Sequence, residues 1–178
     1  VGMIEKGELD PHTGQFELVD GEIIWLGFPN LNHNLVVGAI YVLLVQFAKE
    51  IDGIAFVDGA GFIVGPQSRN LRGPDVALVT NERRHTVPDD GKWGEAAPDL
   101  AVEVLSREQH GEAYARQKVP EYLGSGGKIV WLVDPDKRTI RVYEVDQPRF
   151  RIYSGDSEIT LDQIAPGFRA PISSFFPN

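Results

Sequence analysis

The chain has 178 residues, of which 42% are hydrophobic, and it contains no cysteine. A chain of this length buries enough apolar surface for one globular domain, so we expect residues 1–178 to form a single domain. The lack of cysteine excludes disulfides and thiolate metal sites, and it agrees with a reducing, cytoplasmic setting. The formal net charge of -9 argues against a surface that binds nucleic acid over its whole area, because phosphate binding depends on Lys and Arg.

The negative charge is concentrated near the N-terminus. Residues 1–66 hold nine acidic residues and only two lysines, whereas the charges of residues 67–178 are nearly balanced. Small basic clusters in the second part, such as Arg83 with Arg84, are compatible with local contacts to phosphate groups. The longest apolar run, Leu35 to Val45, is well short of the roughly 18 to 20 residues that cross a bilayer, so we expect a soluble protein without a membrane partner.

The first predicted elements are a hairpin and a helix. An Asp20–Gly21 pair between two apolar runs favours a tight two-residue turn. From Leu31 to Ile51 the pattern is helical, with Asn30 or Asn32 as the N-cap. This helix is apolar nearly all round, so we expect it to be buried on most faces, in the core or in the interface of a homodimer.

Strands and one more helix follow. The apolar runs predict strands at 54–57, 61–64, 75–79 and 100–105. Residues 106–127 then read as a helix that is kinked or restarted at Pro120, because proline lacks the amide hydrogen that a helix uses. Residues 128–145 predict a hairpin that turns at 134–138, and no element is assigned to residues 159–176. This order predicts an α/β fold with a mixed sheet flanked by helices.

Two acidic residues stand out in the predicted strands. Asp75 opens the run DVALV, and Glu103 interrupts the apolar run LAVEVL. If the two strands are neighbours, both carboxylates can converge on one face of the sheet, where a hard cation such as Mg²⁺ would offset their repulsion. The alternatives are structural: an Asp75 that satisfies turn amides and a Glu103 that pairs with an arginine.

These residues and the segments around them resemble a known superfamily. The segments PDVALV, VEVLS, KVPEYLGSG and VWLVDP, in this order and spacing, resemble the PD-(D/E)XK nuclease superfamily. Within it, the chain is most similar to a restriction-endonuclease-like family of bacterial proteins that is common in cyanobacteria. The resemblance extends from ELVDGEIIW through His33 to VWLVDP and implies a restriction-endonuclease-like α/β fold.

The resemblance also implies roles for single residues. It implies that Asp75 and Glu103 bind Mg²⁺ or Mn²⁺ and that a lysine positions or activates the attacking water. The lysine expected two residues after the glutamate is replaced by Leu105, and Lys118 in the following helix is the replacement that we predict. Glu22 is a further predicted metal ligand, although a strand glutamate after a turn is more often solvated. His33 is either a substrate or metal contact or a structural residue.

The predicted function is therefore that of a metal-dependent endodeoxyribonuclease, with Asp75, Glu103 and Lys118 as catalytic residues and DNA as its partner. One alternative is a non-catalytic module that binds nucleic acid or protein through the same fold. Another is a hydrolase that uses two carboxylates without a metal, as glycosidases do.

Overall fold

The computed structural model describes residues 15–106 and 111–177, and a mixed six-stranded sheet forms its centre. The strand order in this sheet is β10-β9-β8-β7-β6-β3, and the order in a second, smaller sheet is β2-β1-β5-β4. The bounds of the strands are β1 Phe16–Val19, β2 Glu22–Trp25, β3 Ile54–Val57, β4 Phe62–Val64, β5 Asn70–Arg72, β6 Val76–Val79, β7 Leu100–Val104, β8 Ile129–Asp134, β9 Thr139–Glu144, β10 Arg151–Ser154, β11 Glu158–Thr160 and β12 Arg169–Pro171. The helices are α2 Leu31–Glu50 and α3 Gly111–Gly124, with short 3₁₀ turns at η1 Pro66–Ser68, η2 Asn81–Thr86 and η3 Ile172–Phe175.

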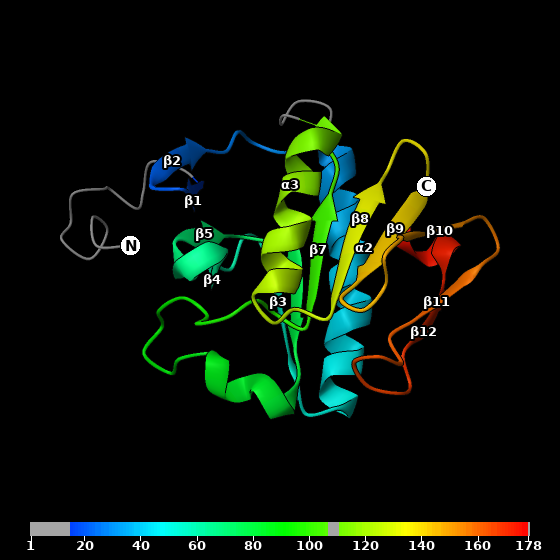
Figure 1. The fold of residues 1–178 in the computed structure, drawn as a ribbon. Helices are drawn as coiled ribbons and strands as arrows, with labels where there is room; N and C mark the ends of the chain where they lie inside the picture. The colour runs from blue at the N-terminus through cyan, green and yellow to red at the C-terminus, as the bar shows by residue number, and fades with distance from the viewer. Residues whose placement is uncertain (1–14, 107–110, 178) are drawn as a thin grey trace.

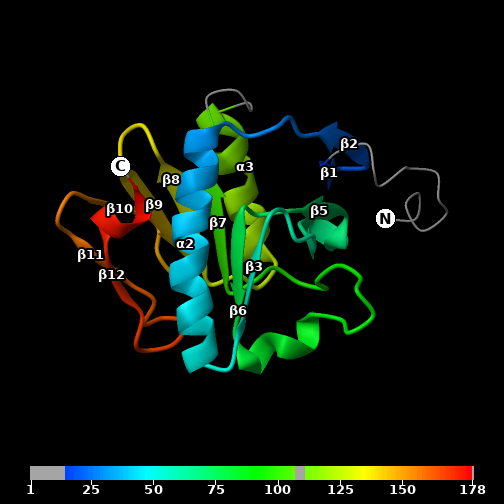
Figure 2. The ribbon, with the colours of Figure 1, turned by 180° about the vertical axis from the view of Figure 1, so that it is seen from behind.

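The two long helices cover opposite faces of the large sheet. Helix α3 lies in front of β7 in Figure 1, and α2 lies in front of the sheet when the molecule is seen from behind in Figure 2. Strands β7 and β8 are parallel and are joined through α3, whereas β6 and β7 are antiparallel. Because side chains alternate along a strand, Val76 and Val102 pack on the α2 side, and Ala77 and Ala101 pack on the α3 side.

The predicted hairpin is present and begins the smaller sheet. Asp20 and Gly21 both have positive φ, 50° and 90°, which suits the tight turn between β1 and β2. Strand β5, which was not predicted from the sequence, pairs with β1 through Leu18 and Leu71. This pairing brings the N-terminal hairpin beside the segment that leads to Asp75.

Helix α2 confirms the predicted range to within one residue and the predicted cap. The backbone N–H of His33 donates to the Asn30 side chain at 3.0 Å. By length and composition α2 would also fit a membrane span, yet one of its faces packs in the core through residues such as Ile40 and Leu44. In the monomer one face of α2 is buried against the sheet, whereas Leu35 and Val42 are exposed, so the predicted burial of the remaining faces in a homodimer interface stays a prediction.

Helix α3 runs from Gly111 to Gly124 with Pro120 inside it, so the predicted restart at Pro120 is wrong. The first residues of the predicted helix, 107–110, lie outside the described residues. Val119 and Tyr122 of α3 are buried in the second core cluster, which also contains residues of β7 and β8. This packing against the sheet stabilises the helix despite the hydrogen bond that proline cannot donate.

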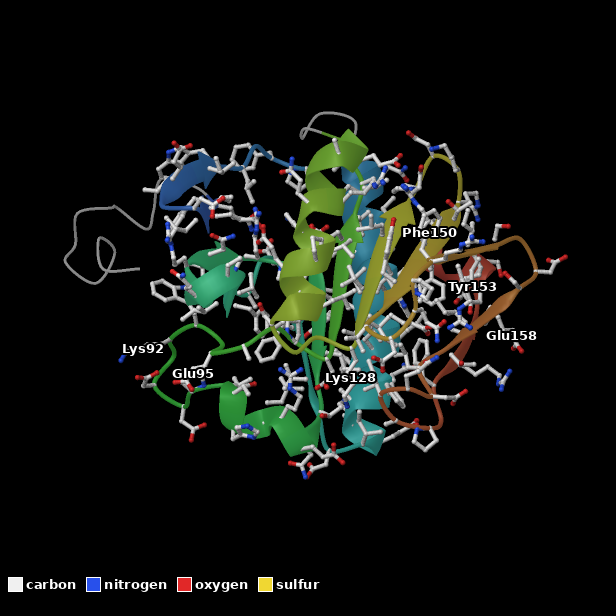
Figure 3. All side chains as sticks on the ribbon, viewed as in Figure 1. Lys92, Glu95, Lys128, Phe150, Tyr153 and Glu158 are labelled. Carbon is white, nitrogen blue, oxygen red and sulfur yellow. The ribbon has the colours of Figure 1, made fainter. Side chains whose placement is uncertain are left out.

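The C-terminal segment, which the sequence left unassigned, adds β11, β12 and η3 to the α2 side of the sheet. Phe168 and Phe175 pack against Trp131 of β8. Their ring centroids lie 6.1 and 5.7 Å, respectively, from the ring centroid of Trp131. Phe150 and Tyr153 lie at the β9 and β10 side of the molecule (Figure 3). The segment is thus held by aromatic contacts to a distant strand rather than by a local pattern.

Candidate functional site

Asp75 and Glu103 lie next to each other at one end of the paired strands β6 and β7 of the large sheet. The register of β6 and β7 pairs Val76 with Val102, and its continuation by one residue sets Asp75 opposite Glu103. The backbone N–H of Val104 donates to Asp75 Oδ2 at 2.7 Å, which ties the start of β6 to the end of β7. Both carboxylates line the same cavity. The predicted convergence of two strand carboxylates is therefore present.

Helix α3 supplies two partners to Glu103. The Lys118 ammonium lies 2.8 Å from Glu103 Oε2, and the Tyr122 hydroxyl donates to Glu103 Oε1 at 2.7 Å. Lys118 and Tyr122 are four residues apart, so they lie on the same face of the helix. Lys118 and Glu103 are 4% and 6% exposed. The lysine that the sequence placed in this helix thus contacts the predicted glutamate in a buried ion pair.

A third carboxylate reaches the same lysine from the small sheet. Glu17 Oε1 lies 2.9 Å from Lys118 Nζ, and Glu17 Oε2 accepts from Arg72 Nη1 at 2.9 Å. Arg72 is fully buried and also donates to Glu121 of α3 through Nε and Nη2, at 2.8 and 2.7 Å. Such a two-pronged contact fits the planar guanidinium. The ion pairs therefore form a chain that links Glu121, Arg72, Glu17, Lys118 and Glu103.

Three members of this site were not predicted from the sequence: Glu17, Arg72 and Tyr122. Glu17 carries the same signal that identified Glu103, since it is an acidic residue between apolar neighbours in a short strand, FELV. Its role depends on the contact between the hairpin and α3, which no local pattern reveals. Arg72 and Tyr122 carry no local signal that separates them from ordinary surface or core residues.

The cavity beside these residues is small, with a volume of about 70 Å³. It is lined by Asp75, Glu103 and Lys118, together with His33, Asp58 and the backbone that follows β7. Such a volume is enough for several water molecules or a hydrated cation, but not for a nucleotide. A larger substrate would have to lie at the mouth of the cavity and extend only its reacting group inward.

Burial and charge shift the protonation equilibria of the site. Burial raises the pKa of Glu103 to about 7, and the carboxylates of Asp75 and Glu17 act in the same direction, while Lys118 opposes them. Burial lowers the pKa of Lys118, but the carboxylates of Glu103 and Glu17 outweigh it and hold the pKa above its usual 10.5. Lys118 therefore carries its charge at neutral pH, whereas the ionised form of Glu103 needs further positive charge nearby to become dominant.

His33 and Glu22 take different places. His33 Nε2 lies 3.4 Å from Asp75 Oδ1, and the residue is buried at the edge of the cavity. Burial lowers the pKa of His33, but the contact with Asp75 outweighs it and raises the pKa above 6.5. Glu22 is exposed at the start of β2, where it pairs with Val19, and it does not line the cavity. The structure thus places Glu22 outside the cavity, and the carboxylate that the hairpin contributes to the chain of ion pairs is Glu17.

The carboxylates of Asp75 and Glu103 are a suitable pair of oxygen ligands for a divalent cation. Within residues 15–106 and 111–177, no group of three or more His, Asp and Glu side chains is arranged to hold a metal ion. Mg²⁺, however, commonly binds through one or two carboxylates and completes its shell with water and substrate oxygens. Asp75 and Glu103 each keep lone pairs beyond the hydrogen bonds described above, since a carboxylate offers about four acceptor positions. The pair meets this requirement.

Comparisons with known proteins identify the family and the fold. A sequence model of the Uma2 family, described as "Putative restriction endonuclease", matches residues 4–173. No curated protein matches the chain. One similar solved structure is that of "a putative nuclease belonging to DUF820" from Anabaena variabilis. It is 21% identical, with a TM-score of 0.82, and the match covers 98% of this chain and 96% of that chain. The predicted restriction-endonuclease-like α/β fold is therefore confirmed.

Proposed function

The chain belongs to the Uma2 family, described as "Putative restriction endonuclease", and from this premise we propose that it is a metal-dependent endodeoxyribonuclease that hydrolyses phosphodiester bonds. The observation that carries the proposal is the buried pair of Glu103 and Lys118 beside Asp75. A buried ion pair is seldom the most stable choice for a core, because apolar residues often serve stability as well or better. Such a pair at the wall of a cavity is typical of a functional site.

The formal charges of the site favour a divalent cation. When all four are ionised, the carboxylates of Asp75, Glu103, Glu17 and Glu121 outnumber the cations Lys118 and Arg72 by two. In the metal-free protein a proton on Glu103, whose pKa is raised to about 7, or on His33 beside Asp75 reduces this excess. Two excess negative charges in a largely buried site are unfavourable without a counter-charge. In this proposal Asp75 and Glu103 hold Mg²⁺ or Mn²⁺, which would stabilise negative charge on the scissile phosphate and make water more acidic.

Lys118 has the second role in the proposal. Its ammonium is held within hydrogen-bond distance of Glu103, so it stays beside the predicted metal ligands. From this position it orients a water molecule toward the phosphate and stabilises charge that develops on the transferred group. Tyr122 keeps the Glu103 carboxylate oriented by donating to its second oxygen.

His33 is expected to help hold Asp75 in place from the other side of the cavity. Its imidazole faces Asp75 Oδ1, while the backbone N–H of Val104 binds Asp75 Oδ2. Two fixed oxygens restrict the rotation of the carboxylate, which is what a metal ligand with a defined geometry needs.

The test is cleavage of plasmid DNA and of labelled single- and double-stranded oligonucleotides by purified protein. The reactions contain Mg²⁺, Mn²⁺ or a chelator. The proposal requires cleavage with either metal, its loss with chelator, and its loss in the Glu103→Gln variant. DNA binding without cleavage by the intact protein would instead support a non-catalytic module on the same fold. Metal-independent hydrolysis of glycosides would support a carboxylate-pair hydrolase.

A further inference from the structure

Glu17 is a buried carboxylate in the chain of ion pairs to which the proposed chemistry assigns no role. Only 1% of its surface is exposed, and it lies on β1 of the small sheet, away from the strands that carry Asp75 and Glu103. Both of its oxygens are engaged. Oε1 lies 2.9 Å from Lys118 Nζ and accepts from the Gly73 backbone N–H at 3.1 Å, and Oε2 accepts from Arg72.

The Lys118 ammonium lies between two carboxylates that belong to different sheets. Glu103 Oε2 is 2.8 Å away and Glu17 Oε1 is 2.9 Å away. In the proposed function Glu103 also binds a cation, which competes with Lys118 for the negative charge of that carboxylate. Glu17 does not bind the cation in this proposal, so its attraction for the ammonium persists when the cation is present.

Glu17 is itself held in place. Arg72 is fully buried between Glu17 and Glu121, and the continuation of the β1–β5 register sets Glu17 opposite Arg72. Because each charged group of this chain has a partner of opposite sign, Glu17 cannot rotate away without leaving Arg72 with less compensation. The carboxylate therefore acts as a fixed anchor for a long and otherwise flexible lysine side chain.

We propose that Glu17 is a positioning residue that holds the Lys118 ammonium at the cavity wall while Glu103 is engaged with a cation. The inference rests on the proposed nuclease function for its kinetic part, because it assigns Glu17 an effect on cleavage through Lys118. It also makes a statement about the lysine itself that does not depend on cleavage. In the absence of the Glu17 charge, the ammonium loses a carboxylate that holds it in place.

Glu17→Gln is the informative variant, since the amide has nearly the same shape and keeps one oxygen acceptor. Glu121→Gln is the matched control. It removes the same charge from the same chain of ion pairs, but from the carboxylate that contacts Arg72 on the side away from Glu17. Circular dichroism and thermal unfolding identify any variant that fails to fold, and Glu17→Asp then serves as a second variant that retains the charge.

The kinetic experiment measures kcat and KM for cleavage of duplex DNA at saturating Mg²⁺. We expect Glu17→Gln to lower kcat about tenfold or more with a change of less than about threefold in KM, because the effect concerns positioning in the transition state. In a Lys118→Met background the same change should cost nothing further, since interacting residues are not additive. Unchanged kcat in Glu17→Gln, or effects of the two substitutions that multiply, would overturn the proposal.

The second experiment observes the lysine directly by nitrogen-15 NMR of side-chain ammonium groups, without DNA. We expect the Lys118 signal of the wild type, assigned by its loss in Lys118→Met, to be visible because the group is buried and doubly paired. It should broaden or disappear in Glu17→Gln and remain in Glu121→Gln. An unchanged signal in Glu17→Gln contradicts the positioning role even if DNA is cleaved. A lost signal supports this role even if no nuclease activity is found, so the two proposals can fail separately.

Discussion

Lys118 and Glu103 form a buried ion pair across the interface between α3 and β7, with Nζ 2.8 Å from Oε2. The lysine is absent from the strand position that the superfamily pattern assigns to it, where this chain has Leu105. It reaches the glutamate from the helix instead. The pair explains how the site can keep a cationic group beside its carboxylates although the strand motif is incomplete.

The first prediction concerns this lysine. Lys118→Met keeps most of the side-chain volume and removes the charge, so we expect turnover to fall by about 100-fold or more. Mg²⁺ affinity, measured by calorimetry at pH 8.5 where Glu103 is ionised, should change little. Lys128→Met is the control, because Lys128 lies at the opposite end of the sheet and pairs with Asp99 at 3.3 Å (Figure 3). Equal cleavage rates in wild type and Lys118→Met would reduce Lys118 to a structural residue.

The second prediction concerns Asp75. Asp75→Ala should abolish binding of Mg²⁺ and Mn²⁺ while the fold is retained, and Asp75→Asn should do the same while keeping an acceptor for the Val104 N–H. Loss of a carboxylate ligand removes both charge and a hard oxygen donor. The measurement is a calorimetric titration of each variant.

Two further carboxylate variants serve as controls for the Asp75 variants. Asp58→Asn changes a carboxylate that lines the same cavity but is hydrogen-bonded to Gln15. Glu22→Gln changes the exposed glutamate that the structure places outside the cavity. Both should bind metal like the wild type. Unaltered affinity in the Asp75 variants would assign this residue to the support of the strand ends alone.

The third prediction is a pH dependence of the metal-free protein. The pKa of Glu103 is raised to about 7, above its usual 4.5, mainly by burial. The folded state therefore holds this proton more tightly than the unfolded state, so the contribution to stability is fully present below about pH 4.5 and is lost as the pH rises through 7. The loss amounts to at most about 1.4 kcal/mol per pH unit in this window.

Comparison with Glu103→Gln isolates this effect, because the amide does not titrate. The free energy of unfolding, measured with denaturant and chelator at several values between pH 5 and 8, should fall with rising pH more steeply in the wild type than in the variant. Parallel curves would show that the proton on Glu103 is bound equally in both states.

The fourth prediction concerns the homodimer that the apolar helix suggested. Leu31, Leu35 and Val42 are exposed at a spacing that puts them on one face of α2, and Gly38 between them has open space around its Cβ position. This stripe suits contact with the same helix of a second copy. Light scattering should give a dimer mass for the wild type and a monomer mass for Leu35→Glu.

Ile152→Glu is the control for the dimer. It changes an exposed apolar residue on β10 instead of one on α2, so the variant should remain dimeric. Strand β10 lies on the side of the molecule opposite the small sheet (Figure 1). A monomeric wild type, or a variant at Ile152 that alone becomes monomeric, would contradict an interface built on α2.

The amino-acid sequence by itself determined the main elements and one half of the site. The turn at Asp20–Gly21, the range of α2 and the strands that hold Asp75 and Glu103 follow from local periodicity and capping. The family resemblance also follows from short motifs in order, and the family match confirms it. These features depend on residues close together in the chain, where the alternation of side chains and the helical repeat leave few options.

Only the tertiary structure decided which charged groups meet. The hairpin could have presented Glu17 or Glu22, and the pairing of β1 with β5 together with the packing of α3 selected Glu17. The same packing buries Arg72 and Tyr122 and keeps α3 continuous through Pro120. Such contacts join segments up to about one hundred residues apart, and their energies depend on burial and distance, which no local pattern encodes.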